Sequence, residues 1–219
     1  MKILICSYRE WSNRIVNKLR NESTVEVEHL LEPELFEKKV TENQFDIIFF
    51  IGWSTIIPEE IVKNAMCVCM HPSPLPKYRG GSPIQHQILA GEIYSAVTLF
   101  KMTKDIDAGP ILWQKAFSLE GDLDEIFERI IEGTFEGITS LLNSYPAISY
   151  SEQMSSNATY FARRTPEMSE ITLNEIMSMS SKQLLDKVRC LQPPYPTAYI
   201  KCGDGSKLYL RQVDASIEN

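Results

Sequence analysis

Short apolar runs alternate with helix-like segments along the first half of the chain, and this alternation constrains the fold more than any other feature. The apolar runs predict buried or half-buried strands at residues 2–6, 24–28, 45–51 and 66–70. Helices are expected between them, at residues 11–21 and 58–64. Because strands that alternate with helices usually lie in a parallel sheet, the sequence predicts an α/β fold.

The same signals continue to residue 144. Ser82 is positioned to cap a helix that has Pro83 in its first turn and Gly91 just beyond its end. Strands are expected at residues 97–102 and 111–117. A capping box formed by Asp122 and Glu125 predicts the start of a long helix. Its apolar stripe indicates core and consists of Leu123, Ile126, Phe127, Ile130, Ile131, Phe135, Ile138 and Leu142.

The stretch from Tyr145-Pro146 to Asn157 is the one plausible linker. We therefore predict a main domain at residues 1–144, followed at residues 145–219 by a linker and a small C-terminal appendage. The appendage is expected to hold a helix at residues 181–191 and a β-hairpin. In that hairpin, residues 198–202 pair with residues 208–212 across a Gly-Asp-Gly turn.

The composition narrows the class of protein. A content of 43% hydrophobic and 23% charged residues is typical of a globular domain. The net charge of −7 argues against binding to a nucleic-acid backbone, which requires a concentrated positive surface. The first apolar run is too short for a signal peptide, and no later run is long enough to span a membrane. We expect a cytoplasmic protein with neither a nucleic-acid nor a membrane partner.

The five cysteines predict no disulfide framework, because their number is odd and they are scattered. Cys67 and Cys69 share one strand face and lack the second ligand pair that a zinc site needs, so no metal is expected. Buried, reduced thiols are expected at Cys6, Cys67, Cys190 and Cys202.

A candidate site begins where the predicted strand at residues 66–70 ends. His71 follows that strand and leads into a proline-rich loop that carries Lys77 and Arg79. Asp107 lies in a later loop, next to two small residues. Ligands of open α/β sheets bind at the carboxyl ends of strands. The pattern therefore predicts a catalytic or binding site rather than core.

These residues resemble the folate-dependent formyltransferase family, whose hallmark is Asn-x-His, then Ser-Leu-Leu-Pro-x-Tyr-Arg-Gly, then Asp-x-Gly. The resemblance implies a Rossmann-like formyltransferase domain. Residues 160–167 and 191–196 resemble the branch that formylates nucleotide-linked amino sugars. The positions in register with the family are His71, Ser73, Leu75, Pro76, Tyr78, Arg79, Gly80, Pro83, Gly91, Thr98, Asp107 and Gly109.

The resemblance implies that His71 and Asp107 meet in space and catalyse formyl transfer to an amine. A carboxylate near an imidazole orients it and favours its charged form, which stabilises a tetrahedral oxyanion or relays the amine proton. The alternative is a structural histidine and a loop-capping aspartate. His29 and His86 are expected to be structural.

Cys69 stands where the family has its asparagine, whose amide donates a hydrogen bond to the developing oxyanion. Such a contact contributes about 2.7–4 kcal/mol to lowering a barrier, and a thiol is only a weak donor. Three interpretations are open: a small residue that shapes the pocket, a weakly polar participant, or a nucleophile that forms a formyl-thioester. The third requires a lowered pKa of the thiol, and direct transfer favours the first two.

The formyl donor implied by the resemblance is N10-formyltetrahydrofolate, and residues 51–58 and 102–107 match the walls that hold its pterin. The expected contacts of this reduced folate are Trp53, Ser54, Ile57 and Asp105. Trp53 is equally suited to be a core aromatic residue. No Gly-x-Gly-x-x-Gly follows the first strand, so a nicotinamide cofactor has no support.

A second group of residues is suited to the acceptor, a sugar-nucleotide diphosphate. Exposed cations are commonly only solvated, and the arginine of the proline-rich loop is also suited to tying that loop down. The expected acceptor contacts are Tyr8, Arg9, Lys77, Tyr78 and Arg79.

The predicted function is transfer of a formyl group from N10-formyltetrahydrofolate to the amine of a nucleotide-linked amino-deoxy sugar, in the synthesis of polysaccharide or glycan precursors. One alternative is a methionyl-tRNA formyltransferase, which the acidic charge disfavours. Another is a non-catalytic relative that binds folate or a sugar nucleotide, which the presence of both His71 and Asp107 disfavours. The sugar, the nucleotide, the position of the amine and a homodimer are left open.

Overall fold

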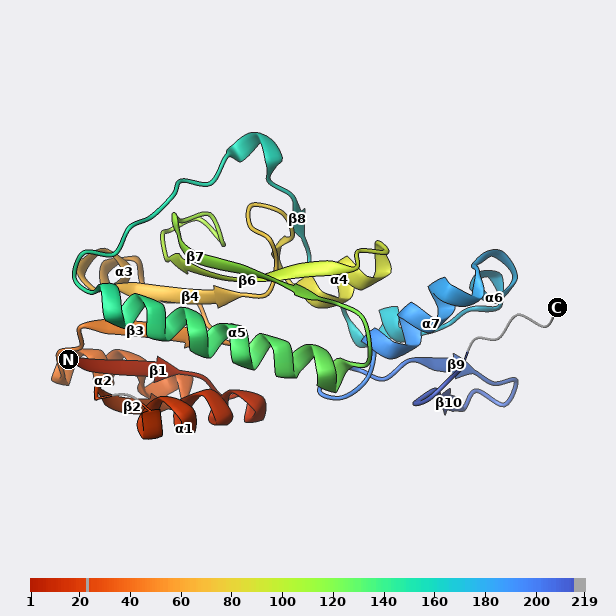
Figure 1. Ribbon diagram of the computed structural model, residues 1–219. Coiled ribbons are helices and arrows are strands. Elements are labelled where there is room, and N and C mark those ends of the chain that lie inside the picture. The colour runs from red at the N-terminus through yellow and green to blue at the C-terminus, as the bar shows by residue number, and fades with distance from the viewer. Residues whose placement is uncertain (23, 215–219) are drawn as a thin grey trace.

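The computed structural model describes residues 1–22 and 24–214 and contains a six-stranded sheet (Figure 1). Its strands are β1 (Lys2–Cys6), β2 (Glu26–Leu30), β3 (Ile47–Ile51), β4 (Cys67–His71), β6 (Tyr94–Lys101) and β7 (Ile111–Ser118). They lie in the order β2-β1-β3-β4-β6-β7. The pairs among β2, β1, β3 and β4 are parallel, whereas β4–β6 and β6–β7 are antiparallel. The predicted α/β fold with a mostly parallel sheet is confirmed.

Helices cover both faces of this sheet. Alternate residues of β1 enter different cores, since Ile3 and Ile5 join one cluster while Leu4 and Cys6 join the other. The first cluster includes residues of α1, α4 and α5, and the second includes residues of α2 and α3. The helices are α1 (Asn13–Glu22), α2 (Phe36–Glu42), α3 (Glu59–Asn64), α4 (Pro83–Leu89) and α5 (Leu123–Ser144).

The start of α5 confirms its predicted capping box. The Asp122 carboxylate accepts a hydrogen bond from the Glu125 main-chain N–H at 2.9 Å, and the Glu125 carboxylate accepts one from the Asp122 N–H at 3.1 Å. The predicted apolar stripe of this helix is buried, apart from the partly buried Phe135, which packs against the same core. This anchors α5 along β6 and β7.

Several element boundaries differ from the prediction. The strand expected at residues 24–28 lies two residues later, and the first residues of the helix expected at 11–21 form a 3-10 turn, Glu10–Ser12. Ser82 precedes α4 as expected, but it adopts a left-handed conformation with φ 53° and its side chain does not cap the helix. The Ser82 hydroxyl oxygen instead accepts a hydrogen bond from the Arg164 main-chain N–H at 3.1 Å, so the predicted cap is wrong.

Residues 145–214 return to the main sheet at several points. In Figure 1 the teal segment after α5 arches over β6 and β7, and the blue elements lie beyond α4. Ser151 pairs with Ile111 through two main-chain hydrogen bonds, and α7 packs on α4. The predicted helix and hairpin are present. The elements of this part are β8 (Tyr160–Phe161), which pairs with β5 (Arg79–Gly80) of the earlier chain, α6 (Leu173–Ser178), α7 (Ser181–Cys190), β9 (Tyr199–Lys201) and β10 (Lys207–Tyr209).

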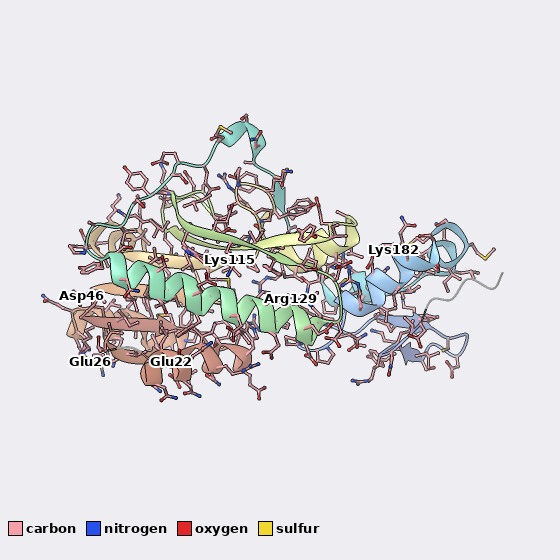
Figure 2. All side chains as sticks on the ribbon, in the orientation of Figure 1. Glu22, Glu26, Asp46, Lys115, Arg129 and Lys182 are labelled. Carbon is pink, nitrogen blue, oxygen red and sulfur yellow. The ribbon has the colours of Figure 1, made fainter. Side chains whose placement is uncertain are left out.

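Charged side chains such as Glu22, Glu26 and Lys182 project from the outside of the molecule (Figure 2). Within the described part of the chain, no helix is both long and apolar enough to cross a membrane.

The thiols of Cys6, Cys67 and Cys190 are free and buried, as predicted. Cys202 is exposed, so the prediction that it is buried is wrong. The residue follows β9 at the turn of a two-stranded hairpin, and such a turn has too few neighbours to cover a side chain.

Candidate functional site

Strand β4 carries two of the candidate residues to the edge of the sheet. Side chains alternate along a strand, so Cys67, Cys69 and His71 face the same side. His71 is the last residue of β4 and pairs with Thr98 of the antiparallel neighbour β6. The strand therefore delivers a thiol and an imidazole, two residues apart, to the place where the sheet changes from parallel to antiparallel.

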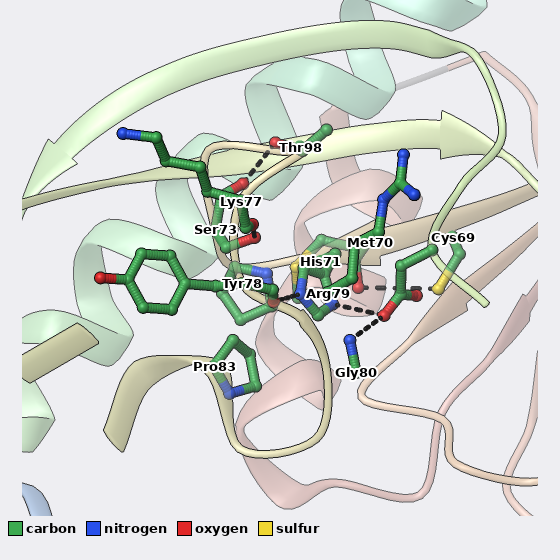
Figure 3. A network of polar contacts seen from close by, with 12 residues as sticks. Cys69, Met70, His71, Ser73, Lys77, Tyr78, Arg79, Gly80, Pro83 and Thr98 are labelled. Atoms are coloured by element: carbon green, nitrogen blue, oxygen red, sulfur yellow. Dashed lines mark hydrogen bonds and ion pairs between the residues drawn. The ribbon is translucent and has the colours of Figure 1, made fainter. Parts of the chain in front are cut away.

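His71 lies between a carboxylate and a main-chain oxygen (Figure 3). Its side chain is buried, with Nδ1 3.5 Å from Oδ2 of Asp107 and Nε2 2.7 Å from the main-chain oxygen of Tyr78. Because a carbonyl oxygen only accepts hydrogen bonds, Nε2 carries a proton. This arrangement leaves Nδ1 as the ring nitrogen that faces the carboxylate.

The Asp107 carboxylate is held by a glycine N–H. Gly80 donates to Oδ2 of Asp107 at 2.8 Å, the same oxygen that faces His71. Gly80 has a φ of +93°, and a Cβ on it would lie 2.3 Å from the main-chain oxygen of Phe161. Only glycine combines this conformation with so close an approach to β8.

Tyr78 adopts a strained backbone conformation that neighbouring residues hold in place. Its φ is 59°, and a non-glycine residue in such a region costs about 1–3 kcal/mol. The Tyr78 N–H donates to the Thr159 hydroxyl oxygen at 2.8 Å, its ring stacks on Phe161 with centroids 5.2 Å apart, and its hydroxyl donates to Glu92 at 2.9 Å. Burial and the Glu92 contact raise the pKa of Tyr78 to about 12. These contacts fix the Tyr78 carbonyl that orients His71. The substrate contact expected of Tyr78 stays a prediction.

The two cations of the proline-rich loop have different surroundings. Arg79 is 4% exposed, and its Nε and Nη2 donate to Oε1 of Gln153 at 3.1 and 2.6 Å. Its Nη1 donates to the Tyr160 hydroxyl oxygen. These contacts favour the interpretation that Arg79 ties its loop down. Lys77 is exposed and stays the cation of this loop that is accessible to a ligand.

Cys69 is surrounded by groups that oppose ionisation. Burial raises the pKa of the Cys69 thiol, and the nearby Asp107 carboxylate raises it further. The thiol's hydrogen-bond partner is the main-chain oxygen of Met70, at 3.7 Å. A reactive thiolate needs the opposite environment, so the structure favours a pocket-shaping or weakly polar Cys69 over a nucleophile.

A second group of predicted residues gathers after β1 and β3. The Tyr8 hydroxyl bonds to the Ser54 hydroxyl and accepts from the Ser54 main-chain N–H at 3.0 Å. The Tyr8 ring centroid lies 5.3 Å from that of Trp53, and the Arg9 guanidinium lies 4.9 Å from the Tyr8 ring centroid. Residues expected to contact the acceptor (Tyr8 and Arg9) and the donor (Trp53 and Ser54) therefore form one cluster.

Trp53 combines the two interpretations given for it. Its ring packs near Phe36 and Phe50 in the second core, while its buried Nε1 has no hydrogen-bond partner in the described part of the chain. A buried N–H without an acceptor costs about 1–3 kcal/mol. A ligand that offers a carbonyl oxygen or a ring nitrogen, as a pterin does, would satisfy this donor, so the residue fits a reduced folate.

The other expected donor contacts lie in different surroundings. Ile57 is buried in the second core, and Asp105 is exposed in the loop before Asp107. Among residues 1–22 and 24–214, no three His, Cys, Asp or Glu side chains are grouped as metal ligands.

Two residues that support this site, Thr159 and Gln153, were not identified from the sequence. Gly80 was matched to the family pattern, but no role was predicted for its N–H. Gly80 and Thr159 lie in segments that match the formyltransferase pattern or adjoin it. Gln153 lies in the predicted linker, and no sequence signal marks it.

Residues 6–132, which include Cys69, His71 and Asp107, match the Formyl transferase family. The chain is 34% identical over 150 residues to a methionyl-tRNA formyltransferase of Thermotoga maritima, covering 66% of this chain and 47% of that protein. It spans about half the length of the curated relatives that it matches.

Two solved structures illustrate the likeness of fold. A methionyl-tRNA formyltransferase from Clostridium thermocellum superposes with a TM-score of 0.82 at 31% identity, covering 95% of this chain and 96% of the other. A sugar N-formyltransferase from Shewanella sp. FDAARGOS_354 superposes with a TM-score of 0.74 at 20% identity, covering 100% of this chain and 99% of the other. The family match spans more than half of the chain and contains the His71–Asp107 pair, and the chain therefore belongs to the formyl transferase family.

Proposed function

We propose that the chain transfers a formyl group from N10-formyltetrahydrofolate, the donor that this family uses, to a primary amine. One observation carries the proposal: a buried His71 oriented by the Tyr78 carbonyl, with Nδ1 3.5 Å from the Asp107 carboxylate, inside the matched segment. An amine attacks only in its neutral form and must lose a proton as the new C–N bond forms. This pair offers the amine a proton acceptor.

His71 acts first as the base in this scheme. Nδ1 accepts the proton that the amine nitrogen loses as it bonds to the formyl carbon, and the electrons of the carbonyl bond move to the formyl oxygen. The Asp107 carboxylate stabilises the resulting imidazolium. His71 then returns the proton to N10 of the folate as the C–N10 bond breaks, so that tetrahydrofolate and an N-formyl product leave and His71 is regenerated.

The oxyanion formed in this reaction has a weak donor at the position of the family's asparagine. The raised pKa of the Cys69 thiol keeps its S–H proton in place. A thiol donates more weakly than an amide. We therefore expect slower turnover than an asparagine at this position would give.

We propose that the amine belongs to a nucleotide-linked amino-deoxy sugar, in the synthesis of a glycan precursor. The net charge of −7 supports a small substrate over a nucleic acid, because binding to a phosphate backbone draws on many cations. The exposed Lys77 and, separately, the half-buried pair Arg9 and Tyr8 supply cations and an aromatic ring of the kind that bind a diphosphate and a sugar ring.

A second candidate acceptor is methionyl-tRNA. The observation that favours it is the identity of 28–34% to methionyl-tRNA formyltransferases, compared with 20% to the sugar N-formyltransferase. The acidic charge opposes it.

A parallel assay separates the two acceptors. Purified protein is incubated with N10-formyltetrahydrofolate and either a panel of uridine- and thymidine-diphosphate amino sugars or methionyl-tRNA, and the N-formyl product is measured by mass spectrometry. The proposal expects a formylated sugar nucleotide and an inert methionyl-tRNA. Formylation of methionyl-tRNA alone would replace the proposed acceptor with the second candidate. Folate binding without any formyl product would identify a non-catalytic relative.

A further inference from the structure

Gln153 lies in the segment between α5 and β8 that arches over the sheet (Figure 1). Its side chain is half-buried, whereas its neighbours Glu152 and Met154 are exposed. Two residues earlier, Ser151 is fixed to Ile111 at the start of β7 by main-chain hydrogen bonds of 2.8 and 2.9 Å. The segment is therefore anchored next to the loop that carries Asp107.

The amide oxygen of Gln153 contacts the loop that follows His71. Oε1 accepts hydrogen bonds from Nε and Nη2 of Arg79, at 3.1 and 2.6 Å. Arg79 precedes Gly80, whose N–H donates to the Asp107 carboxylate. The Gln153 amide oxygen therefore fixes β5, the strand whose Gly80 N–H donates to the Asp107 carboxylate.

The amide nitrogen of Gln153 contacts the loop that carries Asp107 itself. Nε2 donates to the main-chain oxygens of Asp107 and Gly109, at 3.0 and 2.7 Å. The partners fix the orientation of the amide, because a guanidinium only donates and main-chain oxygens only accept. One side chain thus joins the two loops whose separation sets the distance between Asp107 and His71.

The backbone of the Asp107 loop has two features that these contacts stabilise. Asp107 has a φ of 51°, in the left-handed region, which aspartate adopts more readily than most residues but only at isolated positions. A Cβ on Gly109 would lie 1.8 Å from the main-chain oxygen of Lys101, so the far end of this loop is packed directly against β6. The hydrogen bonds from Gln153 to the main-chain oxygens of Asp107 and Gly109 stabilise the loop at both of these residues.

We infer that Gln153 is a positioning residue for formyl transfer, an inference that rests on the proposed function. It does not touch the reacting atoms. Its amide holds the Asp107 loop against the Arg79–Gly80 strand, so that the carboxylate stays at 3.5 Å from Nδ1 of His71. Misplacement of a catalytic group by about 1 Å can cost on the order of 100-fold in rate.

Two variants separate this role from a purely structural one. Gln153→Met keeps the size of the side chain and removes both sets of hydrogen bonds. Gln153→Glu keeps acceptors for Arg79 but loses the two donations to Asp107 and Gly109. If Gln153 positions Asp107, both variants lower kcat by about 10- to 100-fold, with little change in the KM for the formyl donor. If Gln153 only ties Arg79 down, Gln153→Glu keeps the wild-type kcat. The exposed Met154→Ala is the matched control.

A double-mutant cycle with Asp107→Asn tests the coupling directly. Once the carboxylate is lost, its position no longer matters, so adding Gln153→Met to Asp107→Asn should change kcat by less than about twofold. Equal fold-losses of kcat in both backgrounds would overturn the inference.

A measurement that needs no activity distinguishes failure of this inference from failure of the proposed function. The chain has three histidines, so the ring signals of ¹⁵N-labelled histidine can be assigned by comparison with His71→Asn. Gln153→Met should move the His71 ring signals, because the neighbouring carboxylate shifts, while Met154→Ala leaves them in place. Unmoved His71 signals in Gln153→Met would refute the positioning role, whatever reaction the protein catalyses. Moved signals in a protein that transfers no formyl group would refute only the proposed function.

Discussion

The Nε2 nitrogen of His71 lies 2.7 Å from the main-chain oxygen of Tyr78, a residue whose own φ is 59°. The imidazole is therefore oriented by a backbone carbonyl. That carbonyl points at His71 because Thr159, Phe161 and Glu92 hold Tyr78 in an unfavourable conformation. The orientation of His71 thus depends on β8 and the residue before it, about ninety residues later in the chain.

Substitution of Cys69 tests the oxyanion donor. Cys69→Asn should retain or raise kcat, because an amide donates a stronger hydrogen bond than a thiol at the same strand position. Cys69→Ser should retain substantial activity. Steady-state kinetics of the three proteins gives the comparison, and loss of turnover in both variants would instead indicate a nucleophilic thiol.

The environment of Cys69 also predicts its reactivity toward iodoacetamide. Alkylation requires the thiolate, and burial together with the Asp107 carboxylate raises the pKa of the Cys69 thiol. The exposed Cys202 should therefore be modified first, and Cys69 should resist modification in the folded protein. Peptide mass spectrometry of a time course measures both rates.

The same method also tests direct transfer. Enzyme mixed with formyl donor alone should carry no formyl adduct on Cys69, and an adduct that forms and decays at the turnover rate would contradict direct transfer.

Gly80→Ala tests the close contact between β5 and β8. The new Cβ would lie 2.3 Å from the Phe161 oxygen, in a residue with a φ of +93°. The variant should lose about 1–3 kcal/mol of unfolding free energy from the backbone strain, and more from the clash. Its kcat should also fall, because the Gly80 N–H donates to Asp107.

Gly205→Ala is the matched control for this change. Gly205 has a similar φ of +83°, but a Cβ there meets no atom within 4 Å. The variant should show only the backbone strain and an unchanged kcat. Denaturant unfolding measures both stabilities, and equal losses in the two variants would show that the contact with Phe161 contributes little.

Most strands of the sheet could be predicted because each of them shows a local apolar pattern. The apolar runs of β1, β3 and β4 are continuous, since strands buried on both faces leave no room for polar positions. The capping box at Asp122 also lies within four consecutive residues. His71 and Asp107 could be paired only through the formyltransferase resemblance, because no spacing rule connects positions so far apart in sequence.

Two short helices were not predicted because they bury few side chains. Helix α2 buries Phe36 alone, and α6 buries no residue, so neither shows an apolar stripe. The Thr172–Glu175 capping box was the readable signal for α6. Gln153 was beyond prediction for a different reason: its partners lie 44 to 74 residues away, and a lone glutamine in a linker-like stretch carries no local pattern.

The measurement that tests the His71–Asp107 pair most directly is single-turnover formyl transfer with a ¹³C-labelled formyl donor and the acceptor found active in the parallel assay. His71→Asn and Asp107→Asn each preserve the approximate size of the side chain, and thermal unfolding monitored by circular dichroism verifies that both variants are folded. We predict that each lowers the rate of N-formyl product formation by about 10²- to 10⁴-fold, the range for loss of a general acid–base group. A near-wild-type rate in folded His71→Asn protein would contradict the proposed role of the pair.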